Sequence, residues 1–127
     1  MADVVLAFDF GLKHIGVAVG QSITRTASPL TTLRASNGKP DWREVRELVE
    51  QWRAQLLLVG LPLNMDDTES DMSERARAFA EQLATRLGVE VALVDERLSS
   101  FEASRLSEVD NHAIAASLIA ESYLNSQ

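Results

Sequence analysis

The sequence predicts a single α/β domain built on a mixed five-stranded sheet, with helices on its faces. Three observations predict it. Short apolar runs follow one another through tight connections early in the chain, helix and strand patterns then alternate, and neither a linker nor an internal repeat interrupts the 127 residues. A chain of this length forms one domain of ordinary size but not two. We therefore expect residues 1–127 to fold as one domain.

The first three strands are expected to form an antiparallel meander. Residues 4–10 are a nearly unbroken apolar run, interrupted only by Asp9, which is typical of a buried strand. Gly11 ends this run, and residues 15–20 and 27–33 read as the second and third strands. Because the connections between these runs are short, neighbouring strands should run in opposite directions.

The remaining elements should alternate between helix and strand. Residues 37–40 read as a loop, and Asp41 followed by Glu44 resembles a capping box at the start of a helix that reaches Trp52. The same kinds of pattern predict a strand over 55–61, a helix over 72–87, a strand over 89–94, a short helical piece over 99–106 and a final helix over about 111–124.

Composition narrows the class of protein. The chain is 46% hydrophobic and 24% charged, which is typical of a folded globular domain. It has no apolar run of about 20 residues, so no membrane span is expected, and its start does not resemble a secretion signal. It contains no cysteine, which excludes disulfides and thiolate metal sites. We therefore expect a cytoplasmic protein.

The net charge of −7 argues against non-specific binding of nucleic acid. It does not exclude a nuclease, because carboxylates that hold metal ions add to the formal negative charge until a cation binds. Ten of the twelve basic residues are Arg, whose forked geometry suits phosphate, although most surface arginines simply face solvent.

Asp9 is the first candidate for chemistry. An unpaired carboxylate inside an apolar strand would cost several kcal/mol if it were buried. A partner arginine or a hydrogen bond at the strand end would explain it structurally. The functional interpretation is a metal ligand or general base, which the nearby Gly11 and Gly16 favour because glycine lets other backbone approach closely.

Three further acids could join Asp9. Asp95 and Glu96 end the last predicted strand, and adjacent strand residues point to opposite faces, so spacing alone does not choose between them. Asp110 precedes the final helix, where a helix-capping role would also explain it. Carboxylates from separate elements can hold Mg²⁺ or Mn²⁺, and such ions support phosphodiester hydrolysis.

Candidate contacts for phosphate lie at the same edge of the sheet. Ligands of open α/β sheets bind beyond the carboxyl ends of the strands, which selects Asp9, the turn over 61–64 and the segment 95–97. Asn64 in that turn could contact a nucleic-acid backbone, and Arg97 and Lys13 could stabilise phosphate charge.

The sequence resembles one known family over almost its whole length. The similar blocks, in chain order, are Phe-Asp-Phe-Gly (8–11), Ile-Gly-Val-Ala (15–18), Val-Gly-Leu-Pro-Leu-Asn-Met-Asp (59–66), Asp-Glu-Arg-Leu-Ser (95–99) and Glu-Ser-Tyr-Leu (121–124). They are similar to the YqgF (RuvX) family of Holliday-junction-resolvase-like proteins and pre-16S rRNA nucleases. The resemblance implies a ribonuclease H-like fold, a bacterial cytoplasmic origin, and a metal site formed by Asp9, the acids at 95–96 and an acid on the last helix.

One segment departs from the family pattern. Only residues 104–109 separate Ala103 from Asp110, where the family usually has a longer and often basic stretch. Counting back from Tyr123 places the family's helix acid on His112, whereas the local Val-Asp pattern favours Asp110. We take Asp110 as the expected ligand and His112 as the alternative.

The resemblance and the acids together predict a Mg²⁺- or Mn²⁺-dependent nuclease. Asp9, Glu96 and Asp110 would be its catalytic residues, with Asp95 as the alternative to Glu96. Its expected substrate is precursor rRNA, cut at the 5′ end of 16S rRNA in ribosomal precursors. Branched DNA such as a Holliday junction is the close alternative, and a non-catalytic nucleic-acid-binding module in transcription or ribosome assembly is the third. A monomer and a weak dimer both remain open.

Overall fold

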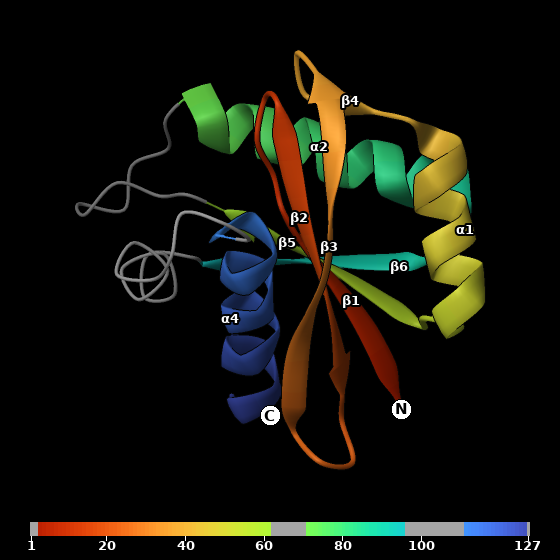
Figure 1. The fold of residues 1–127 in the computed structure, drawn as a ribbon, viewed down its shortest axis with the longest axis vertical. Helices are drawn as coiled ribbons and strands as arrows, with labels where there is room; N and C mark the ends of the chain where they lie inside the picture. Colours follow the sequence, from red (N-terminus) through yellow and green to blue (C-terminus); the bar gives the residue numbers. More distant parts are fainter. Residues whose placement is uncertain (1–2, 62–70, 96–110, 127) are drawn as a thin grey trace.

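The computed structural model describes residues 3–61, 71–95 and 111–126 (Figure 1). Strands and helices alternate within these ranges much as the sequence predicts. They are β1 (Val4–Asp9), β2 (His14–Gln21), β3 (Thr26–Ser36), β4 (Lys39–Pro40), α1 (Trp42–Trp52), β5 (Leu56–Leu61), α2 (Asp71–Leu87), β6 (Glu90–Asp95) and α4 (Asn111–Asn125). The helical piece predicted over 99–106 lies outside the described residues.

The strands form one mixed sheet in the order β4-β3-β2-β1-β5-β6. Strands β1 to β4 pair antiparallel in succession, whereas β5 pairs parallel with both β1 and β6. This confirms the predicted meander followed by alternating helix and strand. It also places the carboxyl ends of β1, β5 and β6 at one edge of the sheet.

The prediction of five strands is wrong, because the described part of the sheet contains six. The additional strand is β4, whose two residues pair with Ala35 and Ser36. Asn37 and Gly38 have φ angles of 51° and 81°, so they form a two-residue hairpin turn of the kind that needs positive φ at both positions. The sequence reads as a loop here because two residues are too few to show strand alternation.

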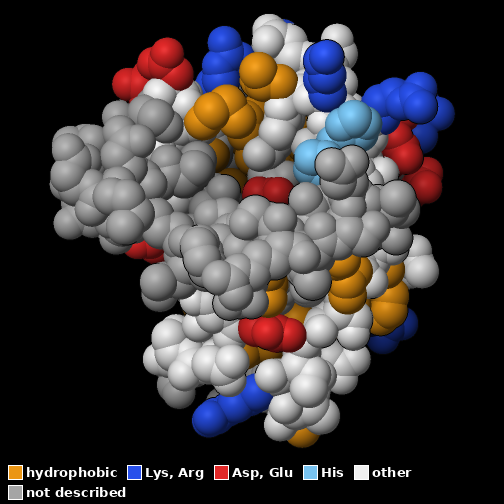
Figure 2. Space-filling view, turned by 60° about the vertical axis from the view of Figure 1, so that its left-hand side comes forward, with side chains coloured by type: hydrophobic (Ala, Val, Ile, Leu, Met, Phe, Trp, Pro, Cys, Tyr) orange, Lys and Arg blue, Asp and Glu red, His pale blue; other side chains and the backbone are white. Residues whose placement is uncertain are grey.

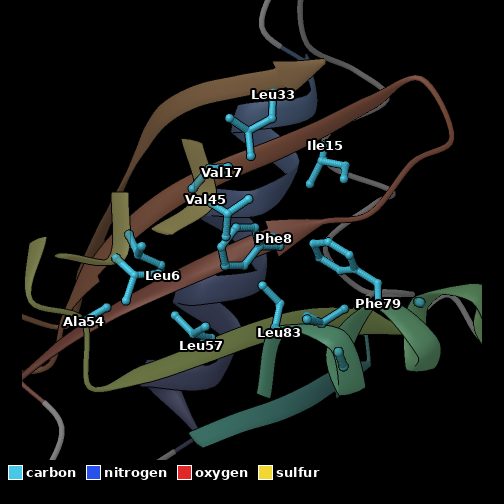
Figure 3. Close-up of a cluster of buried hydrophobic side chains, with 14 of the residues drawn as sticks. Leu6, Phe8, Ile15, Val17, Leu33, Val45, Ala54, Leu57, Phe79 and Leu83 are labelled. Carbon is cyan, nitrogen blue, oxygen red and sulfur yellow. The ribbon is translucent and has the colours of Figure 1, made fainter. Parts of the chain in front are cut away.

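The first face of the sheet carries a core of large side chains. Leu6 and Phe8 of β1 point into it and meet Val45 of α1 and Phe79 and Leu83 of α2 (Figure 3). The rings of Phe8 and Phe79 pack edge to face with their centroids 5.8 Å apart. We call this the α1/α2 face. Burial of these apolar side chains is what holds both helices to the sheet.

The opposite face is covered by α4, and its core combines alanines with branched aliphatic side chains. Val5 and Ala7 of β1 pack there against Ile119 and Ala120 of the helix. We call this the α4 face. Figure 1 shows α4 set apart from α1 and α2. The closest approach is at Gly16 of β2, where the absence of a side chain lets the backbone of α4 nearly touch the sheet.

The helix boundaries follow the predicted signals. The side chain of Asp41 accepts a hydrogen bond of 2.9 Å from the backbone N–H of Arg43, which confirms it as the N-cap of α1. Gly88 follows α2 with a φ of 66°, as expected of a residue that terminates a helix. None of the helices in the described ranges has both the length and the apolar character needed to cross a bilayer.

Candidate active site

Asp9 is the last residue of β1 and its side chain lies on the α4 face. Side chains alternate along a strand, and Val5 and Ala7 of β1 point toward α4 whereas Leu6 and Phe8 point away from it. Asp9 therefore shares the face of Val5 and Ala7, and it is half-buried. This is the strand-end position that the sequence predicts for a functional carboxylate.

The start of α4 reaches the neighbour of Asp9 in the sheet. Gly16 of β2 is the direct partner of Asp9 in the antiparallel ladder. A Cβ atom added to Gly16 would lie 1.9 Å from the backbone oxygen of His112 and 2.8 Å from the backbone nitrogen of Ala113. Only glycine permits this approach. The fold therefore brings the first turn of α4 to the strand end that carries Asp9.

Asp95 lies on the other face of the sheet. It is the sheet partner of Leu61, whose side chain belongs to the core under α1 and α2, while the preceding Val94 packs on the α4 face. Asp95 is exposed. Because β5 separates β6 from β1, the backbones at Asp9 and Asp95 are two strand spacings apart, about 10 Å. The structure does not bring these two carboxylates together.

Four of the predicted site residues, Glu96, Asp110, Asn64 and Arg97, lie outside the described residues. Lys13 is described. It is exposed in the turn between β1 and β2, and its backbone oxygen accepts a 2.8 Å hydrogen bond from the N–H of Ala35. The turn that carries Lys13 is thus fixed to the neighbouring strand, four residues after Asp9.

His112 stacks on a second histidine that the sequence analysis missed. The rings of His14 and His112 lie 5.1 Å apart at an angle of 24°, and Figure 2 shows the two pale-blue side chains in contact. Burial, and secondarily the charge of His14, lower the pKa of His112 below 6.5. No sequence spacing could reveal this pair, because its members come from the start of β2 and the start of α4.

The donor chemistry of this strand end fits a hard divalent cation only in part. Mg²⁺ prefers carboxylate oxygens, and Asp9 supplies one such group on the face where α4 begins. Within residues 3–61, 71–95 and 111–126, no three His, Asp or Glu side chains are close enough together to hold a metal ion. A site at Asp9 with three such ligands would therefore need at least one from residues outside these ranges.

Solved structures define the class of this fold. Thermus thermophilus RuvC in complex with a Holliday junction substrate superposes with a TM-score of 0.59 over 97% of this chain and 94% of that one, at 15% identity. The fowlpox virus resolvase, solved with Holliday junction DNA, gives a TM-score of 0.55 over 97% of both chains at 14% identity. The fold is thus the ribonuclease H-like α/β fold of the resolvases, as the sequence predicts.

Comparison of the sequence identifies the family as well as the fold. The profile of the RuvX family, described as Holliday junction resolvase, matches residues 3–126. The chain belongs to the RuvX family, which confirms the resemblance seen in its motifs.

Curated relatives are similar over most of the chain. A protein of Shewanella denitrificans named "Putative pre-16S rRNA nuclease" is 47% identical over 100% of this chain and 97% of its own length. A protein of the same name from Pectobacterium carotovorum is 58% identical over 78% of this chain and 71% of its own length. The first alignment spans 137 positions against 127 residues here, so that relative carries about ten residues that this chain lacks. A shorter segment before α4, as seen in the motif spacing, would account for such a difference.

Proposed function

We propose that this chain is a divalent-metal-dependent nuclease that hydrolyses phosphodiester bonds in precursor 16S rRNA, with Asp9 at the centre of its active site. The observation that carries the proposal is the placement of Asp9. It is a half-buried carboxylate at the carboxyl end of a central strand, on the face where α4 begins, and its sheet partner Gly16 touches the backbone of His112. Ligand sites of open α/β sheets form at such strand ends.

Glu96 rather than Asp95 is the proposed second acid. Asp95 shares the α1/α2 face with Leu61, opposite the face of Asp9. The placement of Asp95 on the face opposite Asp9 therefore supports Glu96 as the second acid, a choice that the sequence left open.

Asp110 is the proposed third acid. It immediately precedes α4, which starts at Asn111, and the first turn of α4 packs on the sheet partner of Asp9. His112 is the weaker candidate because its ring stacks on His14 and because Mg²⁺ favours oxygen over imidazole. The proposed metal ligands are therefore Asp9, Glu96 and Asp110.

Each group has a distinct part in the proposed reaction. A bound Mg²⁺ or Mn²⁺ would supply positive charge that stabilises the phosphodiester as it is hydrolysed. Asp9 would hold that cation at a fixed strand end, beside the closely packed start of α4. Lys13, four residues after Asp9, is proposed to bind a substrate phosphate, and Asn64 and Arg97, which follow β5 and β6 in the sequence, are proposed to do the same.

The relatives favour RNA as the substrate. Those similar over most of this chain are named for precursor 16S rRNA, whereas the solved resolvases that bind junction DNA share only the fold, at 14–15% identity. We accordingly propose action on ribosomal precursors in the cytoplasm. Cleavage of branched DNA is the second candidate, favoured by the description of the matching family.

A cleavage assay with four proteins tests the active site. Wild type, Asp9→Asn, Glu96→Gln and Asp95→Asn are incubated with a precursor 16S rRNA fragment and with a four-way DNA junction, with Mg²⁺, with Mn²⁺ and with EDTA. Asp9→Asn and Glu96→Gln should each slow cleavage by roughly 10²–10³-fold, the scale of losing one group that stabilises transition-state charge. Asp95→Asn is the matched control and should retain most activity.

The outcomes separate the alternatives. Cleavage in EDTA, or wild-type rates in Asp9→Asn, would refute the proposed site. A larger loss in Asp95→Asn than in Glu96→Gln would reverse the assignment of the second acid. Cutting of the junction but not of the RNA would make branched DNA the substrate, and RNA binding without cleavage of either would identify a binding module.

A further inference from the structure

A second site lies on the α1/α2 face, one residue along the chain from Asp9. There the turn between β3 and β4, the start of α1 and one side of α2 enclose a groove of 420 Å³. We call it the basic groove. Its walls combine three aromatic rings with three cationic side chains: Phe10, Trp42, Phe79, Lys39, Arg75 and Arg86. A volume of this size falls in the range of small-ligand sites.

The aromatic wall is built from contacts between rings. Phe10 and Phe79 have their centroids 5.3 Å apart, and Trp42 stacks on Phe79 at 5.8 Å with an angle of 27°. Phe79 is buried, whereas Phe10 and Trp42 are half-exposed. The guanidinium of Arg86 lies 4.8 Å above the ring of Trp42. The groove therefore presents flat surfaces, which are the feature that nucleobases recognise by stacking.

The cations of the groove keep their charge available for an anion. The hydrogen-bond partners of the two arginines are neutral amides: Arg75 donates to Oδ1 of Asn37 at 3.3 Å, and Nε of Arg86 donates to Oε1 of Gln82 at 2.9 Å. Among the described residues, those that line the groove include no Asp or Glu. In a chain of net charge −7 this is a local excess of positive charge, and the two arginines that carry most of it are oriented by their amide partners.

The groove is linked to the active site through β1. Phe10 directly follows Asp9, so the two side chains leave the chain toward opposite faces of the sheet. The turn between β3 and β4 is fixed at this point, because the N–H of Gly38 donates to the backbone oxygen of Leu12 at 2.9 Å. A strand of nucleic acid crossing this edge of the sheet would thus pass from the groove directly to Asp9.

We propose that the basic groove binds an unpaired segment of the RNA substrate next to the phosphodiester that is cut. One base stacks on the guanidinium of Arg86, which covers the ring of Trp42, and Arg75 and Lys39 contact the adjoining phosphates. The occupant must be single-stranded, because paired bases do not expose their faces. This inference rests on the proposed nuclease function, and it names the substrate as RNA with unpaired nucleotides beside the cut.

The fluorescence of Trp42 provides a direct test. The chain contains two tryptophans, so Trp52→Phe leaves Trp42 as the sole reporter. Asp9→Asn is added, and EDTA is present, so that no cleavage occurs during the titration. We expect an unstructured single-stranded RNA decamer to quench Trp42 in a saturable manner. The same length of RNA duplex should quench it far less.

Two arginine variants test whether the groove itself binds the RNA. Arg75→Gln should weaken binding of the decamer about tenfold, as expected when a charge-assisted contact is lost, and should lower the slope of log K against log salt by about 0.7. Arg43→Gln is the matched control. Arg43 is equally exposed and lies on α1 beside Trp42, but it does not line the groove. Its loss should change affinity less than twofold (on the order of RT).

Three outcomes would overturn the proposal: no quenching by single-stranded RNA, equal weakening by Arg75→Gln and Arg43→Gln, or stronger quenching by an oligoglutamate peptide than by RNA. The last would make the groove a site for acidic protein. Because binding is measured without catalysis, failure here leaves the nuclease assay untouched. Conversely, cleavage that survives Asp9→Asn would refute the proposed active site while the groove could still bind RNA.

Discussion

The two faces of the sheet differ in how closely their helices approach the strands. The α1/α2 face is filled by large side chains such as Phe8, Leu57 and Leu83, which hold the helices at a distance. On the α4 face, glycine and alanine allow the helix backbone to lie almost on the strands. Where an added atom meets the end of a side chain, that side chain can move aside. Where it meets the backbone of a packed helix, the whole helix must shift. The closely packed face carries the proposed catalytic acid, and the side-chain-filled face carries the basic groove.

The strongest test of this contrast is Gly16→Ala. The new Cβ would meet the backbone of His112 at 1.9 Å, so α4 or β2 must shift. We expect a loss of unfolding free energy of about 3 kcal/mol, at the upper end of overpacking effects, together with a loss of cleavage because the start of α4 moves away from Asp9. Urea unfolding and the rRNA cleavage assay measure the two effects.

Gly20→Ala is the matched control on the same face. Its added Cβ would meet side-chain atoms only, the nearest being Cγ2 of Val5 at 2.9 Å and Cδ1 of Leu124 at 3.2 Å. These side-chain ends can move, so the cost should be about 1 kcal/mol and cleavage should persist. Equal costs for the two alanines would show that α4 yields as readily as a side chain does.

Gly38→Ala adds a Cβ atom on the α1/α2 face of the sheet. Gly38 has a φ of 81°, and a Cβ there would lie 2.7 Å from Cζ of Phe10. We expect a cost of about 1–2 kcal/mol, mostly from the backbone conformation. RNA binding by the basic groove should weaken because Phe10 is displaced, whereas cleavage of a saturating substrate should change little. A loss of cleavage as large as that of Gly16→Ala would remove the functional distinction between the faces.

Asp41→Ala removes only a helix cap on the α1/α2 face. The hydrogen bond from the N–H of Arg43 is lost, and we expect about 1 kcal/mol of destabilisation in urea unfolding. Asp41→Asn preserves an acceptor and should restore most of that stability. A variant that unfolds far more easily would indicate that the cap also holds the neighbouring groove in shape.

The smallest effect concerns the histidine pair at the edge of the α4 face. Burial, and then the charge of His14, hold the pKa of His112 below 6.5. Between the lowered pKa of His112 in the folded chain and its ordinary value of 6.5 in the unfolded chain, the unfolded chain binds more protons. The free energy of unfolding therefore falls as the pH decreases through that interval. An NMR titration of His112 should show its lowered pKa, and His14→Gln should bring that pKa part of the way back toward 6.5. An unchanged pKa in that variant would exclude the contribution of His14.

Much of the fold could be predicted from the sequence because its signals are local. The nearly unbroken apolar run over 4–10 predicted β1, which ends one residue earlier at Asp9, and Asp41 predicted the start of α1. The strand β4 was missed because its two residues carry no periodicity, although Asn37-Gly38 is itself a signal for a hairpin. Local patterns thus identify elements that are long enough to repeat.

The candidate site was less predictable because it depends on contacts between distant segments. Motifs identified Asp9, but only the pairing of Leu61 with Asp95 shows that Asp95 lies on the other face. The basic groove was missed entirely. A sequence signal did exist, because Arg75, Gln82 and Arg86 recur at helical spacing on one side of α2. The partner surface from the β3–β4 turn could not be inferred without the fold.

Asp9 and Phe10 are adjacent in the chain, and their side chains serve the two proposed sites on opposite faces of the sheet. The number of residues in β1 before them therefore matters for both sites. A strand that gains or loses one residue exchanges its two sets of side chains between the faces of the sheet. A single insertion ahead of Asp9 would therefore turn the carboxylate toward α2 and the phenyl ring toward α4, and both proposed sites would fail at once. The turns around this strand can vary in length, whereas an insertion between Val4 and Asp9 keeps both side chains on their faces only if it adds an even number of residues.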